Sequence, residues 1–146
     1  MVILSKFAEN LSELMHLHNI KAPALGKLLG ISRTNITRYL QGKYLPGYEH
    51  FIKIVEYFDV SADVLLGRLE YCDVKNFLPV QPFLVRLRKA LDEAHKKQAD
   101  LQNNLHYSSA TTNSWLAGKR IPSVQHMDEL ADYLEVTVDF LLGRVN

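Results

Sequence analysis

The chain has 146 residues, of which 47% are apolar, so it can build one or two packed domains and is not expected to be disordered. It has no run of about eighteen apolar residues, which excludes a membrane span and leads us to expect a cytoplasmic protein without a membrane partner. A single cysteine, Cys72, excludes an internal disulfide and a cysteine-rich zinc site, and the histidines lack a metal-binding pattern, so no cofactor is expected.

The formal net charge of +1 conceals a segregation of charges along the chain. Residues 20–46 contain five bases and no acid, whereas residues 49–63 contain four acids and one base. Residues 96–122 then contain four bases and one acid, and residues 128–139 contain five acids and no base. Because clustered lysine and arginine bind phosphates, each half of the chain has a region suited to nucleic acid.

The first predicted elements are two helices. Phe7, Leu11, Leu14 and His18 recur at spacings of three and four residues, which places one face of an opening helix on a core. A short helix is predicted over residues 22–29. Pro23 suits its first turn, where the missing amide proton would have no partner.

A turn and a third helix follow at Gly30-Ile31-Ser32. Glycine tolerates the left-handed backbone of a tight turn, and Ser32 can cap the next helix by accepting from its exposed amides. That helix is predicted over residues 32–41 and should stop at Gly42, again with a left-handed backbone.

Two more helices complete the first half of the chain. After a loop over residues 43–47, an apolar helical stripe is formed by Phe51, Ile54, Val55 and Phe58. Ser61 is expected to cap a last short helix that ends at Gly67. No segment shows sustained strand alternation, so the predicted fold class is all-α.

The second half of the chain repeats the first. A shift of 76 positions aligns residues 7–70 with residues 83–146 without a gap, and 18 of the 64 pairs are identical. Two tandem five-helix domains are therefore predicted. We name the parts copy one (residues 1–70), the linker (residues 71–82) and copy two (residues 83–146). The linker contains Pro79 and Pro82 but is fairly apolar, so we expect it to pack against one copy or between them.

Two short helices joined by a glycine-containing turn can place the second helix in the major groove of DNA. The residues of copy one that carry a family pattern are Leu25-Gly26, Leu29 to Arg33, Ile36, Arg38-Tyr39, Gly42-Lys43, Pro46, Val60-Ser61 and Leu65-Leu66. In combination they resemble the phage repressor and Cro type of helix-turn-helix domain, also called the XRE family. The resemblance implies two lambda-repressor-like domains and a sequence-specific regulator, most simply a repressor, whose partner is double-stranded DNA.

The resemblance also assigns contact residues in copy one. It places Arg33, Thr34, Asn35 and Thr37 at base edges and Ser32, Arg38 and Lys43 at phosphates. Arginine can pair with guanine and asparagine with adenine in the major groove, so these side chains can read sequence. Gly26 should let the two helices approach, Gly30 should make the turn, and Ile36 with Tyr39 should fill the space between the helices.

Copy two departs from this pattern. Gln102 replaces the small residue, His106 replaces the turn glycine and Thr112 replaces Ile36. A histidine at positive φ carries strain of about 1 kcal/mol. The outward residues of its second motif helix are uncharged. The candidate DNA contacts of copy two are Gln98, where the family usually has a phosphate-contacting glutamine, with Ser109, Thr111, Asn113 and Lys119.

The sequence leaves several alternatives open. Both copies of one chain could straddle a non-palindromic site, or a homodimer could present two copy-one domains to a palindrome, which the neutral helix of copy two favours. Copy two could instead serve dimerisation or effector contact, and any small-molecule effector is undefined. The alternative function is a protein-interaction adaptor, antitoxin-like or anti-repressor, that uses the acidic helices at residues 48–58 and 124–134. No motif of an enzyme is present.

Overall fold

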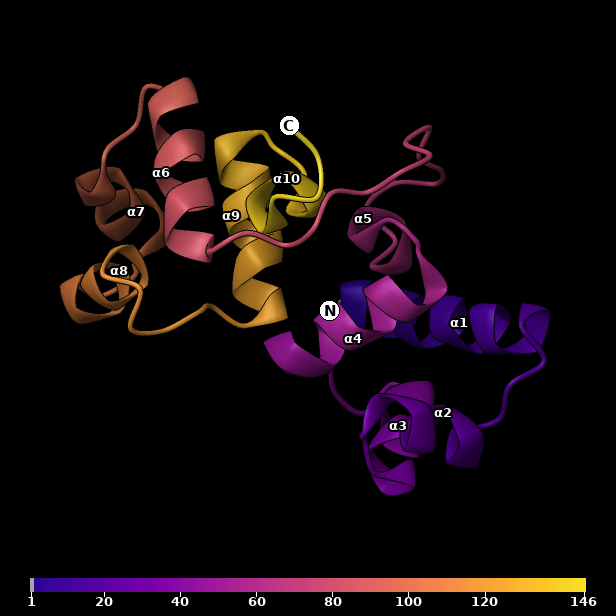
Figure 1. The fold of residues 1–146 in the computed structure, drawn as a ribbon. Coiled ribbons are helices and arrows are strands. Elements are labelled where there is room, and N and C mark those ends of the chain that lie inside the picture. Colours follow the sequence, from indigo (N-terminus) through magenta and orange to yellow (C-terminus); the bar gives the residue numbers. More distant parts are fainter. Residues whose placement is uncertain (1) are drawn as a thin grey trace. The chain divides into compact units, whose positions relative to one another are not determined.

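The computed structural model describes residues 2–146, and all regular structure in this range is helical, which confirms the predicted all-α class (Figure 1). Internal contacts divide the chain into two compact units with a boundary between Lys75 and Asn76. Each unit contains five of the helices in residues 2–146. None of these helices combines the length and apolar character that a membrane span needs.

Copy one contains α1 (Val2–Leu17), α2 (Ala22–Leu29), α3 (Arg33–Leu40), α4 (Tyr48–Phe58) and α5 (Ala62–Leu65). The bounds of α2 are those predicted. Helix α3 is one residue shorter at each end than predicted, because Ser32 and Gln41 are its capping residues. The last helix ends at Leu65 rather than at Gly67, because Leu66 is its C-cap.

The buried face of α1 differs from the predicted stripe. Its buried residues are Ile3, Phe7, Ala8, Leu11 and Met15. Leu14 is only half-buried, and His18, one residue past the end of α1, is exposed although its ring packs edge-on against Phe58 with 5.0 Å between the centroids. Leu14 and Met15 are both apolar and both lie at helical spacing from Leu11, so the period alone does not choose between them. Packing against the rest of copy one selects Met15.

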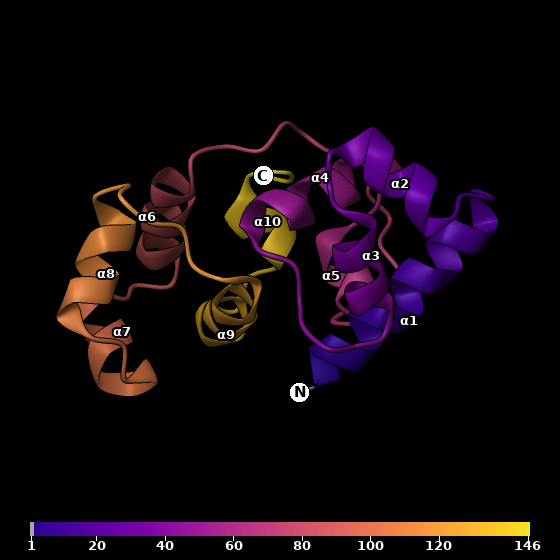
Figure 2. The same ribbon diagram turned by 90° about the horizontal axis from the view of Figure 1, so that it is seen from below.

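Copy two contains α6 (Phe83–Glu93), α7 (Gln98–Leu105), α8 (Ser109–Leu116), α9 (Val124–Leu134) and α10 (Val138–Leu142). Helices α7 and α8 contact each other across a short turn, as α2 and α3 do in copy one (Figure 2). The second helix of each motif begins with a serine cap. Ser32 Oγ accepts from the amide of Asn35, and Ser108 Oγ accepts from the amide of Thr111, both at 3.1 Å.

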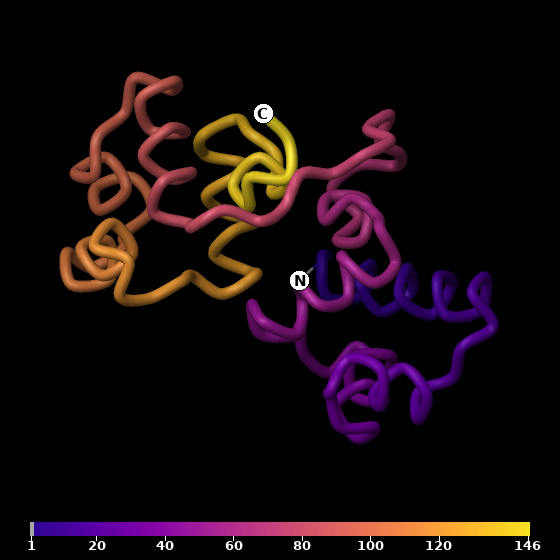
Figure 3. The backbone as a smooth tube through the Cα atoms, in the orientation of Figure 1, coloured from indigo at the N-terminus to yellow at the C-terminus, as the bar shows by residue number. Residues whose placement is uncertain are grey.

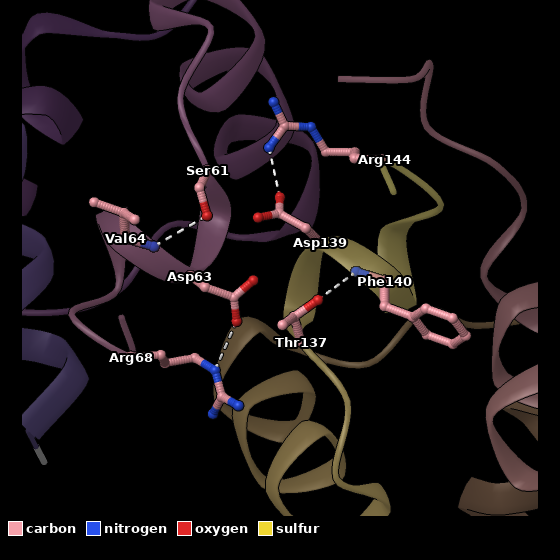
Figure 4. A network of polar contacts seen from close by, with 8 residues as sticks. All are labelled: Ser61, Asp63, Val64, Arg68, Thr137, Asp139, Phe140 and Arg144. Carbon is pink, nitrogen blue, oxygen red and sulfur yellow. Dashed lines mark hydrogen bonds and ion pairs between the residues drawn. The ribbon is translucent and has the colours of Figure 1, made fainter. Parts of the chain in front are cut away.

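The aspartate and the arginine that are identical near the end of the two copies form an ion pair in each copy (Figure 4). In copy one, Arg68 Nε donates to Asp63 Oδ1 at 2.9 Å. In copy two, Arg144 Nη1 donates to Asp139 Oδ1 at 2.7 Å. Both aspartates are buried, and a buried carboxylate without a partner would cost about 3 to 5 kcal/mol. Each pair therefore fixes the chain just after the last helix of its copy.

The second part of the linker belongs to the copy-two unit, and its course can be followed in Figure 3. The amide of Leu78 donates to the carbonyl oxygen of Arg144 at 2.8 Å, and the amide of Gln81 donates to that of Leu142 at 2.9 Å. The guanidinium carbon of Arg144 lies 4.1 Å from the centroid of the Phe77 ring. Residues 76–82 are thus held along the end of copy two.

Candidate nucleic-acid interface

Helices α2 and α3 of copy one approach each other closely at Gly26. A Cβ atom on Gly26 would collide with the carbonyl oxygen of Ile31, so a larger residue does not fit. Gly30 has φ +69°, and the amide of Ile31 donates to the carbonyl oxygen of Gly26 at 2.9 Å. Because glycine adopts this left-handed backbone without a Cβ penalty, the roles predicted for Gly26 and Gly30 are confirmed.

The inner side of α3 is fixed by two buried residues. Ile36 is 0% exposed and Tyr39 is 3% exposed, so both face the core, and the Tyr39 ring packs edge-on against Phe7 of α1 with 6.3 Å between the centroids. Tyr39 Oη is hydrogen-bonded to Nδ1 of His50 on α4 at 2.7 Å. Burial, followed by the nearby Tyr44, raises the pKa of Tyr39 above its ordinary value, so its hydroxyl stays neutral. This anchoring determines which residues of α3 face outward.

The outward side of α3 carries the predicted contact residues. Positions 33, 34, 37 and 38 fall on one side of a helix by its 3.6-residue period, and Asn35 beside them is half-buried. The exposed members of the predicted set are Ser32, Arg33, Thr34, Thr37, Arg38 and Lys43. Ser32 uses an oxygen lone pair for the helix cap, which leaves its hydroxyl hydrogen free to donate. This face is basic, because it exposes Arg33, Arg38 and Lys43 and residues 20–46 contain no acid.

Tyr44, in the loop after α3, was not predicted to belong to this surface. Arg38 Nη1 donates to Tyr44 Oη at 3.2 Å, and Tyr44 Oη donates to Asn35 Oδ1 at 3.3 Å. The Tyr44 ring packs edge-on against Tyr39, with 5.9 Å between the centroids. Helical periodicity carries no information about a loop residue, so the sequence offered only an aromatic side chain next to Lys43 as a signal.

The helix-turn-helix of copy two is held by polar side chains. His106 has φ +60°, the left-handed conformation predicted from its position opposite Gly30. Thr112, which takes the place of Ile36, is 0% exposed. Its Oγ1 accepts from Nε2 of Gln98 and from Nε2 of Gln102, each at 3.0 Å. A hydrogen-bonded hydroxyl thus stands where copy one has a buried apolar side chain.

The outward side of α8 is neutral, and part of it is already hydrogen-bonded. Gln98 is half-buried and donates to Oδ1 of Asn113, while Ser108 Oγ donates to Thr111 Oγ1 at 2.8 Å. Ser109 and Lys119 are exposed, and their side chains make no hydrogen bond or ion pair within residues 2–146. Of the predicted contacts in copy two, three are therefore engaged inside the domain.

Behind α8, an aromatic cluster anchors the helix. Trp115 packs edge-on against Tyr107, with 5.0 Å between the centroids, and lies 5.7 Å from the His126 ring. Tyr107 Oη donates to Glu129 Oε2 at 2.5 Å. Burial raises the pKa of Tyr107 well above its ordinary value, and the hydrogen bond and charge of Glu129 add to this effect. The Tyr107 hydroxyl therefore remains a donor at neutral pH.

An open cavity of about 450 Å³ lies beside the start of α7. Its charged lining residues are Arg88, Asp92, Lys96 and Lys97. The bases outnumber the acid, so the cavity favours anions, although the Lys96 ammonium also lies 4.5 Å from the centroid of the Tyr133 ring. Within residues 2–146, no group of three or more histidine, cysteine, aspartate or glutamate residues could hold a metal ion.

The helix-turn-helix family matches the chain twice, over residues 13–65 and over residues 87–141. Each match includes both helices of one motif and the helix that follows them. Comparisons with curated proteins and with solved structures give no match. The two matches together cover most of the sequence, and the chain therefore belongs to the XRE-type helix-turn-helix family of DNA-binding regulators, with two of its domains in tandem.

Proposed function

We propose that the protein is a sequence-specific repressor that inserts α3 of copy one into the major groove of its operator and thereby blocks RNA polymerase. One observation carries this proposal. The outward side of α3 exposes Arg33 and Arg38 in a region without an acidic residue, while Ile36 and Tyr39 fix the rotation of the helix from behind. A basic, exposed helix with a fixed orientation suits recognition of a groove lined by phosphates.

The proposal gives the residues of copy one two kinds of role. Arg33, Thr34, Asn35 and Thr37 face base edges, because residues in the N-terminal part of a recognition helix enter the groove. Arg33 presents the planar donor pair that matches O6 and N7 of guanine. Phosphates are bound by Ser32, Arg38 and Lys43, which supply a hydroxyl donor and two cations at the borders of the groove.

Copy two has a supporting role in this proposal. The Asn113 amide and the Thr111 hydroxyl are hydrogen-bonded within the domain, and the outward side of α8 has no charge with which to neutralise a phosphate. Lys119 and the bases of the nearby cavity supply contacts to the DNA backbone, and Ser109 adds a neutral donor. The side-chain NH2 group of Gln98 is already donated to Thr112 and Asn113, so it makes no phosphate contact in this arrangement. Base reading then falls to copy one, and two chains form a homodimer that presents two copy-one domains to a palindromic operator.

The dependence of DNA affinity on salt tests the proposal. Duplexes that bind the full chain are selected from a random pool, and their dissociation constants are measured by fluorescence anisotropy at rising salt concentration. The cations Arg38 and Lys43 of copy one alone predict a slope of about −2 in log affinity against log salt, and phosphate contacts from copy two make it steeper. A dimer predicts about twice the slope of one chain. Binding that is absent or insensitive to salt would contradict the proposal and favour the protein-interaction adaptor.

A further inference from the structure

We propose that Tyr44 is a positioning residue: it fixes which way round the side-chain amide of Asn35 faces the DNA, and so sets the base preference at one position of the operator. This inference rests on the proposed function, in which copy one reads base edges. It adds a residue outside the helix-turn-helix to the determinants of specificity.

A chain of hydrogen bonds orients the amide. Arg38 Nη1 donates to Tyr44 Oη at 3.2 Å, which occupies one lone pair of the hydroxyl oxygen. The hydroxyl hydrogen is then directed to Asn35 Oδ1, at 3.3 Å. Hydrogen bonds in a chain polarise one another, so donation by the guanidinium strengthens the donation to Asn35. With its oxygen turned to Tyr44, the amide turns its NH2 group the other way.

Tyr44 can hold this orientation because its own ring is anchored. The ring packs edge-on against Tyr39, which is 3% exposed, with 5.9 Å between the two centroids. Tyr39 is in turn hydrogen-bonded to His50 on α4. The Tyr44 hydroxyl is therefore positioned by the domain core, although 40% of the residue surface is exposed. Losing the hydroxyl alone would leave this aromatic packing in place.

The orientation of the amide decides which bases Asn35 accepts. An outward NH2 group donates, and the acceptors in the major groove are N7 of the purines, O6 of guanine and O4 of thymine. Cytosine presents its N4 amino donor instead, so two donors would face each other. We therefore expect the position that Asn35 contacts to discriminate against cytosine. An amide free to turn over could offer its oxygen to cytosine, and the discrimination would fall.

Copy two lacks all three members of this arrangement. The alignment places Thr111 opposite Asn35, Ser114 opposite Arg38 and Arg120 opposite Tyr44. None of these residues can form the same chain, because neither a phenol nor an amide is present. This chain of hydrogen bonds is specific to copy one, which agrees with the proposal that copy one recognises the bases.

The decisive variant is Tyr44→Phe in the full chain, which removes the hydroxyl and retains the ring. The probes are the duplex selected by the unaltered protein and its single-base-pair variants. Loss of one charge-assisted chain of hydrogen bonds should weaken binding to the selected duplex about three- to tenfold. Discrimination against cytosine should fall by a similar factor at one position and stay unchanged at the others.

Two controls separate positioning from a structural effect. Tyr57→Phe makes the same chemical change at a residue that is also 40% exposed. The Tyr57 hydroxyl makes no hydrogen bond within residues 2–146. This variant should therefore change neither DNA affinity nor base selectivity. In an Asn35→Ala background, Tyr44→Phe should no longer change the discrimination at that base pair. Thermal unfolding checks that each variant is folded.

The outcomes distinguish this inference from the function on which it rests. If Tyr44→Phe keeps full discrimination, or weakens every duplex equally, the inference is wrong. If Asn35→Ala and Arg33→Ala weaken binding at the same time, the proposed function nevertheless stands. If neither of those two variants weakens binding, copy one does not read the DNA, and the proposed function fails together with the inference.

Discussion

At the scale of single residues, one position of the turn shows how the two copies differ. Residue 30 is a glycine at φ +69° and residue 106 is a histidine at φ +60°, so both copies need the same left-handed backbone. Only copy one has the residue that adopts it without a Cβ penalty. Copy two therefore carries local strain at the turn that precedes α8.

Replacing His106 with glycine should relieve this strain. We expect His106→Gly to raise the free energy of unfolding of copy two by about 0.5 to 1 kcal/mol. The chain has one tryptophan, Trp115, which is buried in copy two, so its fluorescence during urea unfolding reports on that domain.

The reciprocal change, Gly30→His, provides the control. A Cβ at Gly30 would meet only Lys53 Nζ, at 3.9 Å, so backbone strain alone should act. It should destabilise copy one by about 1 kcal/mol, as measured by circular dichroism. A loss of stability in His106→Gly would mean that the imidazole makes a stabilising interaction.

Tyr107 should make the stability of copy two depend on pH in the alkaline range. Its pKa is raised by burial and by Glu129, so the folded domain keeps the phenolic proton at a pH where the unfolded chain, with a pKa near 10.0, loses it. The stabilisation that the protonated Tyr107 hydroxyl gives to copy two is complete below about pH 10. It is lost as the pH rises above that value.

The comparison of wild type with Tyr107→Phe measures this effect. Between about pH 9 and pH 11, the unfolding free energy read from Trp115 should fall more steeply in the wild type, at up to about 1.4 kcal/mol per pH unit. Tyr57→Phe in copy one should leave the Trp115 profile unchanged. Parallel profiles for wild type and Tyr107→Phe would show that Tyr107 titrates in the folded domain as it does in the unfolded chain.

At the scale of elements, the two helix hairpins reach the same arrangement by different means. In copy one, the backbone of α2 at Gly26 lies against the turn and the first residue of α3, and Ile36 of α3 is buried. In copy two, α7 and α8 are joined by the hydrogen bonds of Gln98 and Gln102 to Thr112. A side-chain network can thus substitute for a close backbone approach, provided that the buried hydroxyl is satisfied.

Gly26→Ala should disrupt the hairpin of copy one. The added methyl group would collide with the carbonyl oxygen of Ile31, which is backbone and cannot turn aside. We expect a loss of about 1 to 3 kcal/mol in the unfolding free energy of copy one, together with weaker DNA binding.

Gly47→Ser is the matched control for that substitution. A Cβ at Gly47 has no atom within 4 Å, and the equivalent residue of copy two is Ser123, which caps α9. Chemical denaturation followed by circular dichroism should show unchanged or slightly higher stability. If Gly26→Ala were as stable as Gly47→Ser, the close approach of α2 and α3 would not limit the fold.

The elements that the sequence predicted well are those with local signals. Pro23 and Gly30 bracket α2, and Ser32 and Gly42 bracket α3 to within one residue. The buried stripe of α1 was predicted only in part, because neighbouring apolar residues leave the choice to tertiary packing. The network around Thr112 could not be predicted, because hydrogen bonds between separate helices depend on a three-dimensional arrangement that periodicity does not encode.

The same limit applies to the candidate interface. Exposure of Arg33, Thr34 and Thr37 follows from helical periodicity once Ile36 is known to face inward. The contacts of Tyr44 with Asn35 and Arg38 do not follow, because the path of the loop after α3 determines where the phenol lies. Sequence thus indicates which helix residues face outward, and the structure adds how they are oriented.

At the scale of the whole molecule, the duplication separates scaffold from surface. Residues identical in the two copies include the serine caps of α3 and α8 and the aspartate–arginine pairs that close each domain. The outward positions of α3 and α8 differ throughout, and α8 has lost both arginines. The shared caps and ion pairs keep both copies folded. The differing outward residues restrict a basic DNA-binding surface to copy one.

The most direct test of this division compares matched pairs of substitutions in the full chain. Dissociation constants for the selected duplex are measured for wild type, for Arg33→Ala with Arg38→Ala, and for Asn113→Ala with Lys119→Ala. Loss of a base contact and a phosphate contact should weaken binding at least about 100-fold for the copy-one pair, and the copy-two pair should stay within about fivefold of wild type. Equal losses from the two pairs, or a larger loss from the copy-two pair, would contradict the assignment of DNA reading to copy one.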